Sequence, residues 1–255
     1  MTNTNFCIII SGMKILLTIV VNDDLGTRNA PILYDGIEII YPEENEIEKD
    51  FISRASKIGK GKYTVLSDRK FRLADLNSLL NILDKNSADM VSFEGGIAIK
   101  SSLVKNAVKN CTDLFSCLIL SVLDCKTVLK TPYIPFAFNK YQPVFSEENN
   151  EGIILAAEAF SREKATLSKD VYSYCLNTLC NRLVTYYIYT MLAIKNGDVE
   201  GEKLVKFDNR LKSEIVLFLT LEKNFTAAKL SKLRKKNFKI SYFTAKKFKK
   251  ILNIK

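Results

Sequence analysis

The sequence predicts an α/β protein, with an open mixed sheet flanked by helices and a helical extension at its C-terminal end. The prediction rests on two observations. In the first half of the chain, short segments rich in Ile, Val and Leu alternate with amphipathic segments of helical period, as strands alternate with helices in α/β proteins. In the second half, the apolar residues follow a helical pattern almost throughout. Hydrophobic residues make up 47% of the 255 residues, which is enough for a sizeable buried core.

The first strands are expected at residues 14–21 (KILLTIVV) and 36–41 (GIEIIY), because β-branched residues are frequent in both. A helix is expected within residues 43–61, since this segment begins with acidic residues and ends at glycines. The apolar residues that share one face of this helix are Ile47, Phe51, Ala55 and Ile58.

A further strand, helix and strand are expected at residues 63–66 (YTVL), 74–86 and 89–93 (DMVSF). This alternation favours a mainly parallel sheet, in which ligands bind beyond the carboxyl ends of the strands. Two polar segments, NDDLGT at 22–27 and SDRK at 67–70, follow expected strands directly. The sequence therefore predicts a binding site at these two strand ends.

Two helices are expected next, at residues 101–111 and 112–125, followed by an extended segment at 126–138 that contains two prolines. The acidic segment SEENNEG then predicts a boundary between two domains. These domains are residues 1–145, an α/β domain, and residues 146–255, a helical region that ends in a basic tail.

The chain contains no histidine, and its six cysteines show no C-x-x-C spacing. The missing histidine excludes a Ser-His-Asp or Cys-His nucleophile and any histidine base. The cysteines lie mostly in apolar segments, which is typical of reduced, buried thiols in a cytoplasmic protein. Because no apolar run reaches the ~20 uninterrupted residues of a spanning helix, we expect a cytoplasmic protein without a membrane span.

The formal net charge of +10 is concentrated in one segment. Residues 223–255 contain twelve basic residues and no acidic one, and several of their Phe and Leu residues recur at helical spacing. Three interpretations are open. The segment could be a helix that lies on the anionic inner face of the plasma membrane, a helix that packs on the rest of the protein, or a segment that binds nucleic acid. Nucleic acid is disfavoured as a partner, because the basic residues are confined to the tail.

Four motifs occur in the order that is typical of the inverting family 2 glycosyltransferases, which have a GT-A fold. They are VVNDDLGT at 20–27, SRASKIGKGKYTVLSDRKFRLADLNSLLNIL at 53–83, ADMVSF at 88–93 and CTDLFSCLIL at 111–120. As an ordered set, they resemble the nucleotide loop, the metal-binding strand end and the acceptor-side acidic helix of that family. The resemblance covers roughly residues 13 to 140 and implies a GT-A-like nucleotide-sugar-binding domain.

The resemblance also implies a divalent cation, such as Mn²⁺ or Mg²⁺, which an Asp-x-Asp pair holds against the donor diphosphate. In this chain Ser67 and Arg69 occupy the two carboxylate positions, and Asp68 falls on the spacer between them. We therefore expect no metal cofactor. Either Arg69 and Lys70 pair directly with the diphosphate, or the SDRK segment is a solvated loop.

Three more acids receive roles from the resemblance. Asp23 and Asp24 correspond to an acidic pair that accepts hydrogen bonds from a ribose or a base, but the same residues also suit a turn. Asp113 corresponds to the base that removes the proton of the acceptor hydroxyl. Asp113 or Thr112 could equally cap the helix that follows.

The resemblance implies a hexosyltransferase that moves a sugar, with inversion, from a nucleotide sugar to an acceptor. A lipid-linked acceptor in the synthesis of a cell-surface polysaccharide is one candidate. The alternative is a catalytically inactive transferase-like protein that serves in binding or assembly.

Overall fold

The structure is a computed structural model. It describes residues 14–21, 36–67, 71–73, 76–94, 96–132, 136–138, 147–193 and 198–211. The chain divides into two compact units, residues 1–141 and 142–255, whereas the sequence analysis places the boundary after residue 145. The first unit is α/β and the described helices of the second unit follow it, so the predicted α/β class with a helical C-terminal extension is confirmed.

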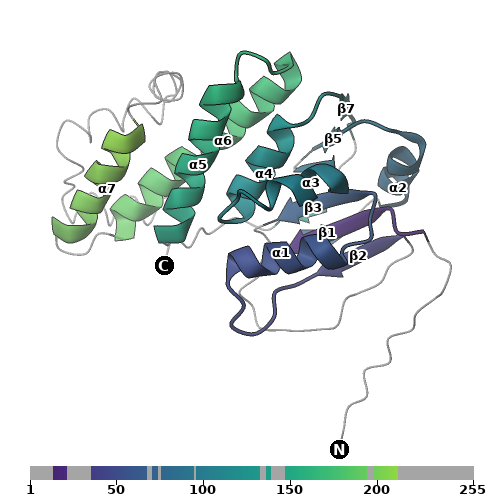
Figure 1. The fold of residues 1–255 in the computed structure, drawn as a ribbon, viewed down its shortest axis with the longest axis horizontal. Coiled ribbons are helices and arrows are strands. Elements are labelled where there is room, and N and C mark those ends of the chain that lie inside the picture. Colours follow the sequence, from purple (N-terminus) through teal and green to yellow (C-terminus); the bar gives the residue numbers. More distant parts are fainter. Residues whose placement is uncertain are drawn as a thin grey trace, which may run out of the picture. The chain divides into compact units, whose positions relative to one another are not determined.

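The first unit contains a six-stranded sheet (Figure 1). Its strands, in spatial order, are β2 (Ile37–Ile40), β1 (Leu17–Val21), β3 (Tyr63–Ser67), β6 (Gly96–Lys100), β5 (Met90–Phe93) and β7 (Val128–Lys130). Strand β1 is parallel to both β2 and β3, and β5 is parallel to β7. Only β6 runs antiparallel to its two neighbours, so the sheet is mixed, as predicted.

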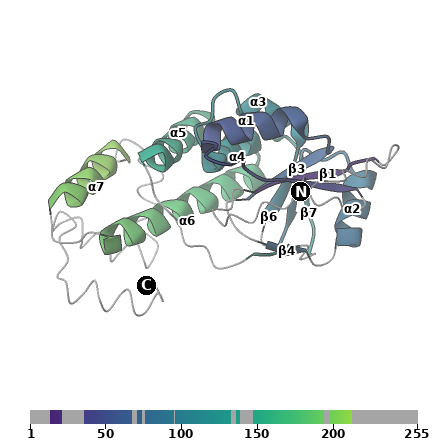
Figure 2. The ribbon, with the colours of Figure 1, turned by 90° about the horizontal axis from the view of Figure 1, so that it is seen from below.

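Four helices cover the two faces of this sheet. They are α1 (Glu48–Ile58), α2 (Leu76–Lys85), α3 (Ser101–Ala107) and α4 (Leu114–Leu123). The side chains of a strand alternate between the faces, so Leu17 and Ile19 pack with Leu79 and Leu83 of α2 in one core cluster. Thr18, by contrast, lies on the opposite face, where Figure 2 shows α1 and α3 together.

A second, two-stranded sheet joins segments that are far apart in the sequence. Strand β4 (Phe71–Leu73) pairs antiparallel with β8 (Phe136–Phe138). The extended segment expected at 126–138 therefore contains two strands, β7 and β8, which belong to different sheets. Neither β4 nor β6 is among the elements expected from the sequence.

The second unit contains α5 (Glu147–Glu163), α6 (Lys169–Ala193) and α7 (Asp198–Leu211), which contact one another. At the α5–α6 contact, the ring centroids of Phe160 and Tyr172 are 5.3 Å apart. The guanidinium of Arg210 donates to both carboxylate oxygens of Glu151, at 2.8 and 3.0 Å, and so links α7 to α5. Among the described helices of the chain, none is both long enough and apolar enough to cross a membrane.

Candidate functional site at the carboxyl ends of the parallel strands

The winding of the sheet reverses between β1 and β3. The chain leaves β1 for β2 on one side and then returns, through α1, to β3 on the other side of β1. In open α/β sheets, such a reversal opens a crevice beyond the carboxyl ends of the two strands, and ligands bind there. The crevice expected from this topology therefore lies beyond the last residues of β1 and β3, which are Val21 and Ser67.

Val21 and Ser67 are direct partners in the parallel register of β1 and β3. Asp68, Arg69 and Lys70 follow Ser67 without a gap, and Asp23 and Asp24 begin two residues after Val21. These five predicted site residues lie outside the described residues. The structure nevertheless brings together the two points at which their segments leave the sheet.

The start of α4, with Asp113, lies at the same edge of the sheet. Helix α1 connects the end of β2 to the beginning of β3, so its first turn lies at the carboxyl ends of these strands. In that turn Glu48 accepts a hydrogen bond through Oε1 from the backbone N–H of Leu114, at 2.9 Å. This bond links the beginnings of α1 and α4, and it places Asp113 near the edge where the two polar segments begin.

Asp113 is the N-cap of α4. Its Oδ1 accepts from the backbone N–H of Ser116 at 2.7 Å, and the Ser116 hydroxyl accepts from the backbone N–H of Asp113 at 3.1 Å. These two bonds form a capping box, which satisfies backbone N–H groups that a helix start leaves unpaired. Asp113 is only 1% exposed. The capping interpretation of Asp113 is therefore confirmed, and its role as a base stays a prediction.

Glu48 is the residue at this edge that the sequence analysis missed. The acidic first turn of its helix is visible in the sequence, but the bond to Leu114 joins residues 66 positions apart. Only the fold brings them together. Two carboxylates thus act on the N-terminus of α4, where the helix dipole favours negative charge.

Two cysteines flank the capping box. Cys111 and Cys117 are both buried, and their side chains form a hydrogen bond to one another. This bond, together with burial, holds the pKa of the Cys117 thiol well above its usual range, while the same bond lowers the pKa of Cys111. Cys117 therefore keeps its proton and donates it, and it does not act as a thiolate nucleophile.

In the motif at residues 53–83, the described residues Arg54 and Gly61 stabilise the fold. Arg54 donates through Nε and Nη2 to the two carboxylate oxygens of Glu46, at 2.8 and 2.7 Å, and through Nη2 to the backbone carbonyl of Tyr41, at 2.8 Å. The hydrogen bonds to Glu46 raise the pKa of Arg54, and they lower the pKa of Glu46. Arg54 thus holds the loop between β2 and α1 in place.

Gly61 brings the start of β3 against β1. A Cβ atom at this position would lie 2.4 Å from the backbone nitrogen of Thr18, so only glycine fits. The backbone N–H of Gly61 donates to the Thr18 hydroxyl at 2.9 Å, and that hydroxyl donates to Oε1 of Glu38 at 2.5 Å. The glycine of the GKGKY motif is therefore explained by close packing of two strands.

The donor set at the end of β3 does not fit a divalent cation. Ser67, at the first position that the resemblance assigns to a metal-bearing carboxylate, is 5% exposed and is the last residue of the strand. Arg69, at the second position, is a cation itself. Elsewhere, the described residues contain no group of three or more acidic or thiol side chains that could hold a metal ion.

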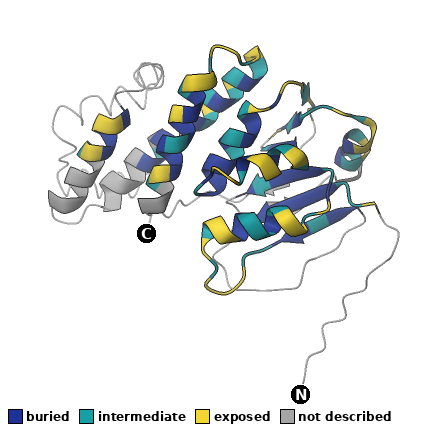
Figure 3. Cartoon of the chain, in the orientation of Figure 1, coloured by how far each residue is buried: buried dark blue, intermediate teal, exposed yellow. Residues whose placement is uncertain are grey.

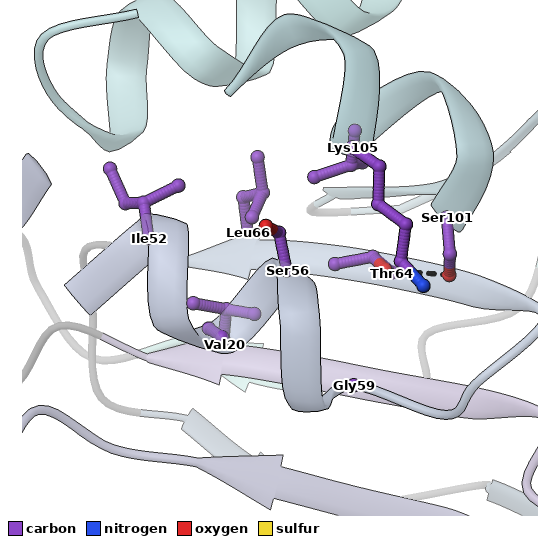
Figure 4. Close-up of a pocket in the computed structure, with 10 residues that line it drawn as sticks. Val20, Ile52, Ser56, Gly59, Thr64, Leu66, Ser101 and Lys105 are labelled. Carbon is purple, nitrogen blue, oxygen red and sulfur yellow. Dashed lines mark hydrogen bonds between the residues drawn. The ribbon is translucent and has the colours of Figure 1, made fainter. Parts of the chain in front are cut away.

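A small hollow lies between α1 and α3 on one face of the sheet (Figure 4). It has room for about one water molecule. Lys105 extends along it towards Thr64 and Ser101, whose hydroxyls share a hydrogen bond of 2.7 Å. The hollow is too small for a nucleotide, so it is not a competing site for that ligand.

Comparisons of the chain with models of protein families, with characterised proteins and with solved structures found no match.

Proposed function

We propose that this protein is a glycosyltransferase that binds a nucleotide-sugar donor beyond the carboxyl ends of β1 and β3. The observation that carries the proposal is the pairing of Val21 with Ser67 at the reversal of the sheet winding. This pairing is where an open α/β sheet offers a crevice for a nucleotide. The mixed sheet with helices on both faces also supports a GT-A-like domain.

In this proposal the donor diphosphate is neutralised by Arg69 and Lys70 in place of a metal ion. Guanidinium groups form forked hydrogen bonds to phosphate oxygens, and a lysine ammonium supplies a compact positive charge. Asp23 and Asp24 bind the ribose or the base. The donor is thus held through the two segments that leave the sheet at Val21 and Ser67.

The transfer step is a displacement at the anomeric carbon. The acceptor hydroxyl oxygen forms a bond to this carbon, the bond from the carbon to the diphosphate oxygen breaks, and the nucleoside diphosphate leaves with the electron pair. Asp113 accepts the hydroxyl proton. The acceptor is a hydroxyl compound of unassigned class, and a lipid-linked acceptor fits the proposed membrane contact of the basic tail, residues 223–255.

A second candidate function is a transferase-like binding or assembly protein without catalysis. The burial of Asp113 favours it, because a carboxylate that is 1% exposed and caps a helix is poorly placed to meet an acceptor hydroxyl. In this alternative the crevice still binds a nucleotide or a nucleotide sugar, but no sugar is transferred.

Calorimetric titration with a panel of nucleoside diphosphates and nucleotide sugars, in EDTA and in Mn²⁺, tests the proposal. We expect binding in EDTA that Mn²⁺ strengthens only slightly. The double variant Arg69→Ala/Lys70→Ala should weaken binding at least tenfold, since charge-assisted bonds to phosphate are lost. The matched control is Lys85→Ala/Lys126→Ala, which removes the same charge near the opposite edge of the sheet and should bind normally.

Release of nucleoside diphosphate from the bound sugar donor separates the two candidate functions. Turnover in the presence of candidate acceptors supports the transferase, whereas tight binding without turnover supports the binding protein. Absence of binding to every member of the panel would contradict both. Binding that depends strictly on Mn²⁺ would contradict the role given to Arg69 and Lys70.

A further inference from the structure

The outer surface of α1 and α3 carries positive charge that the overall composition does not reveal. Residues 51–67 and 95–112 contain no acidic residue, although most of the excess charge of the chain belongs to the tail. The first segment includes α1 after its first turn, which carries Glu48 and Asp50, and the second includes all of α3. The two helices line the same small hollow and therefore lie side by side. In Figure 3 the outward sides of both helices are exposed.

Four lysines define this surface, and we call it the lysine face: Lys57 and Lys60 at the end of α1, and Lys105 and Lys109 on and after α3. All four are exposed, and none forms an ion pair within the described part of the chain. Lys109 lies in the turn that directly follows α3. The hollow beside Lys105 is lined by Ser56 and Gly59, the residues next to Lys57 and Lys60.

One acid on this side of the sheet, Glu38 of β2, is already engaged, while Asp50 lies in the first turn of α1, two turns before Lys57. Oε1 of Glu38 accepts hydrogen bonds from the Thr18 hydroxyl at 2.5 Å and from the backbone N–H of Gly61 at 3.1 Å, and the backbone N–H of Lys60 also donates to it. All four lysines are exposed, so their charge stays accessible to the solvent.

The lysine face also holds an exposed apolar side chain. Ile58, between Lys57 and Lys60, is 49% exposed, and only one other large apolar residue of the described chain is as exposed. An isoleucine among lysines suits the boundary between lipid headgroups and acyl chains, where the apolar group enters and the charges meet anionic headgroups. A nucleic acid would gain from the lysines but not from Ile58.

We propose that the lysine face binds the surface of a bilayer that contains anionic phospholipid. This contact goes beyond the proposed transferase function and is separate from the basic tail. Membrane anchoring generally requires more than one weak signal, and the basic tail, residues 223–255, is the other proposed for this chain. Because the adjacent hollow holds about one water, the face offers charge without a headgroup pocket. Phosphatidylserine and phosphatidylglycerol should therefore serve equally.

Co-sedimentation of the full chain with phosphatidylcholine vesicles, with and without phosphatidylserine or phosphatidylglycerol, tests the proposal. We expect binding only with anionic lipid, equal for the two anionic headgroups, and release when salt rises from about 0.1 M to 1 M. Lys57→Glu/Lys105→Glu should lower the partition coefficient at least tenfold. The matched control Lys85→Glu/Lys169→Glu changes the net charge equally and should lower it less than threefold.

Two further variants keep the test decisive. If Lys57→Glu/Lys105→Glu unfolds, Lys57→Gln/Lys105→Gln takes its place, with an expected loss of about fivefold. Ile58→Ser removes the apolar contact without changing the charge and should lower binding about threefold. Equal binding by the lysine-face variants and the control would overturn the proposal. So would lysine-dependent binding to duplex DNA by a protein that ignores vesicles.

Discussion

The two edges of the six-stranded sheet use their polar residues in different ways. At the amino edge, where β1 and β3 begin, polar side chains bond to the protein itself. Tyr63 donates its hydroxyl to the backbone carbonyls of Asn86 and Ala88, at 3.1 and 2.9 Å, and Lys62 donates to those of Leu83 and Asn86, at 3.0 and 2.6 Å. At the carboxyl edge, the described polar side chains organise helix starts and a loop around the two strand ends.

The difference separates stability from function. Polar groups that are buried and bonded within the protein are costly to remove, because their partners lose a hydrogen bond. We therefore expect substitutions at the amino edge to lower the free energy of unfolding. Substitutions at the carboxyl edge should cost less stability and instead change ligand binding or turnover.

The largest effect is expected at Gly61, at the amino edge. A Cβ atom there would lie 2.4 Å from the nitrogen of Thr18 and 2.7 Å from the carbonyl carbon of Leu17. Both are backbone atoms of β1, so no side-chain rotation relieves the clash. Gly61→Ala should lower the free energy of unfolding by about 3 kcal/mol or more, measured by urea unfolding and circular dichroism. Lys60→Ala, at the exposed neighbour, is the control, and a Gly61→Ala protein as stable as the control would contradict the packing argument.

The next effect is expected at Asp89, which joins β5, β6 and β7 at the amino edge. Burial alone would raise the pKa of Asp89. Its carboxylate, however, accepts hydrogen bonds from the Lys100 ammonium at 2.8 Å and from the backbone N–H groups of Lys126 and Thr127, at 3.0 and 3.1 Å, and these bonds outweigh the effect of burial. They lower the pKa from 3.8 to about 2. The side chain is 18% exposed, so screening by water is limited.

Because the pKa of Asp89 is lower in the folded protein, its contribution to stability is present above pH 3.8 and is lost as the pH falls towards 2. A shift of this size corresponds to about 2 kcal/mol. Asp89→Asn should therefore be less stable than the wild type by about this amount at neutral pH, and the difference should disappear in acid. A difference that is the same at pH 2 and pH 6 would show that Asp89 acts through its shape and not its charge.

A smaller effect is expected at Arg54, at the carboxyl edge. Arg54→Lys keeps the charge but loses the forked contact with Glu46 and the bond to the Tyr41 carbonyl. We expect a loss of about 1 kcal/mol in urea unfolding. The control is Glu43→Gln, because Glu43 is 71% exposed and lies 3.4 Å from Arg54, a contact of little expected value. Equal losses of unfolding free energy in the two variants would contradict the stabilising role given to the forked contact between Arg54 and Glu46.

The smallest effect on stability, and the most informative on function, is expected at Asp113. Asparagine caps helices about as well as aspartate, so Asp113→Asn should change the free energy of unfolding by less than about 0.5 kcal/mol. If Asp113 is the base, the same change should abolish sugar transfer and leave donor affinity intact. Asp113→Ala should lose about 1 kcal/mol in either case. Full turnover by Asp113→Asn would leave Asp113 with the capping role alone.

Local patterns predicted much of this fold. The spacing of apolar residues, the acidic residues at helix starts and the glycines at helix ends predicted strands β1, β2, β3 and β5 and helices α1 to α4. Strand β6 was missed because GIAIK is short and begins at Gly96, two residues after Glu94, so the sequence resembles part of the connection to α3. The β4–β8 sheet joins Phe71 with Phe138, and no local pattern reveals such a distant pairing.

The site was predicted less completely than the fold. The strand ends at Val21 and Ser67 follow from the alternation of elements, and their pairing confirms that the two polar segments begin side by side. For Asp113 the sequence allowed both a cap and a base, because an acid before an apolar helix suits either role. The link from Glu48 to Leu114 depends on the packing of two helices and has no sequence signal.

The location of the nucleotide site is the central claim, and hydrogen–deuterium exchange tests it most directly. The full chain would be compared without ligand and with the nucleotide or nucleotide sugar that binds most tightly in calorimetry. We predict slower exchange in peptides that cover residues 18–26 and 63–72, which meet at the carboxyl edge. Peptides over 84–90 and 124–128, at the amino edge, should be unchanged. Protection confined to the amino edge, or to the second unit, would contradict the claim.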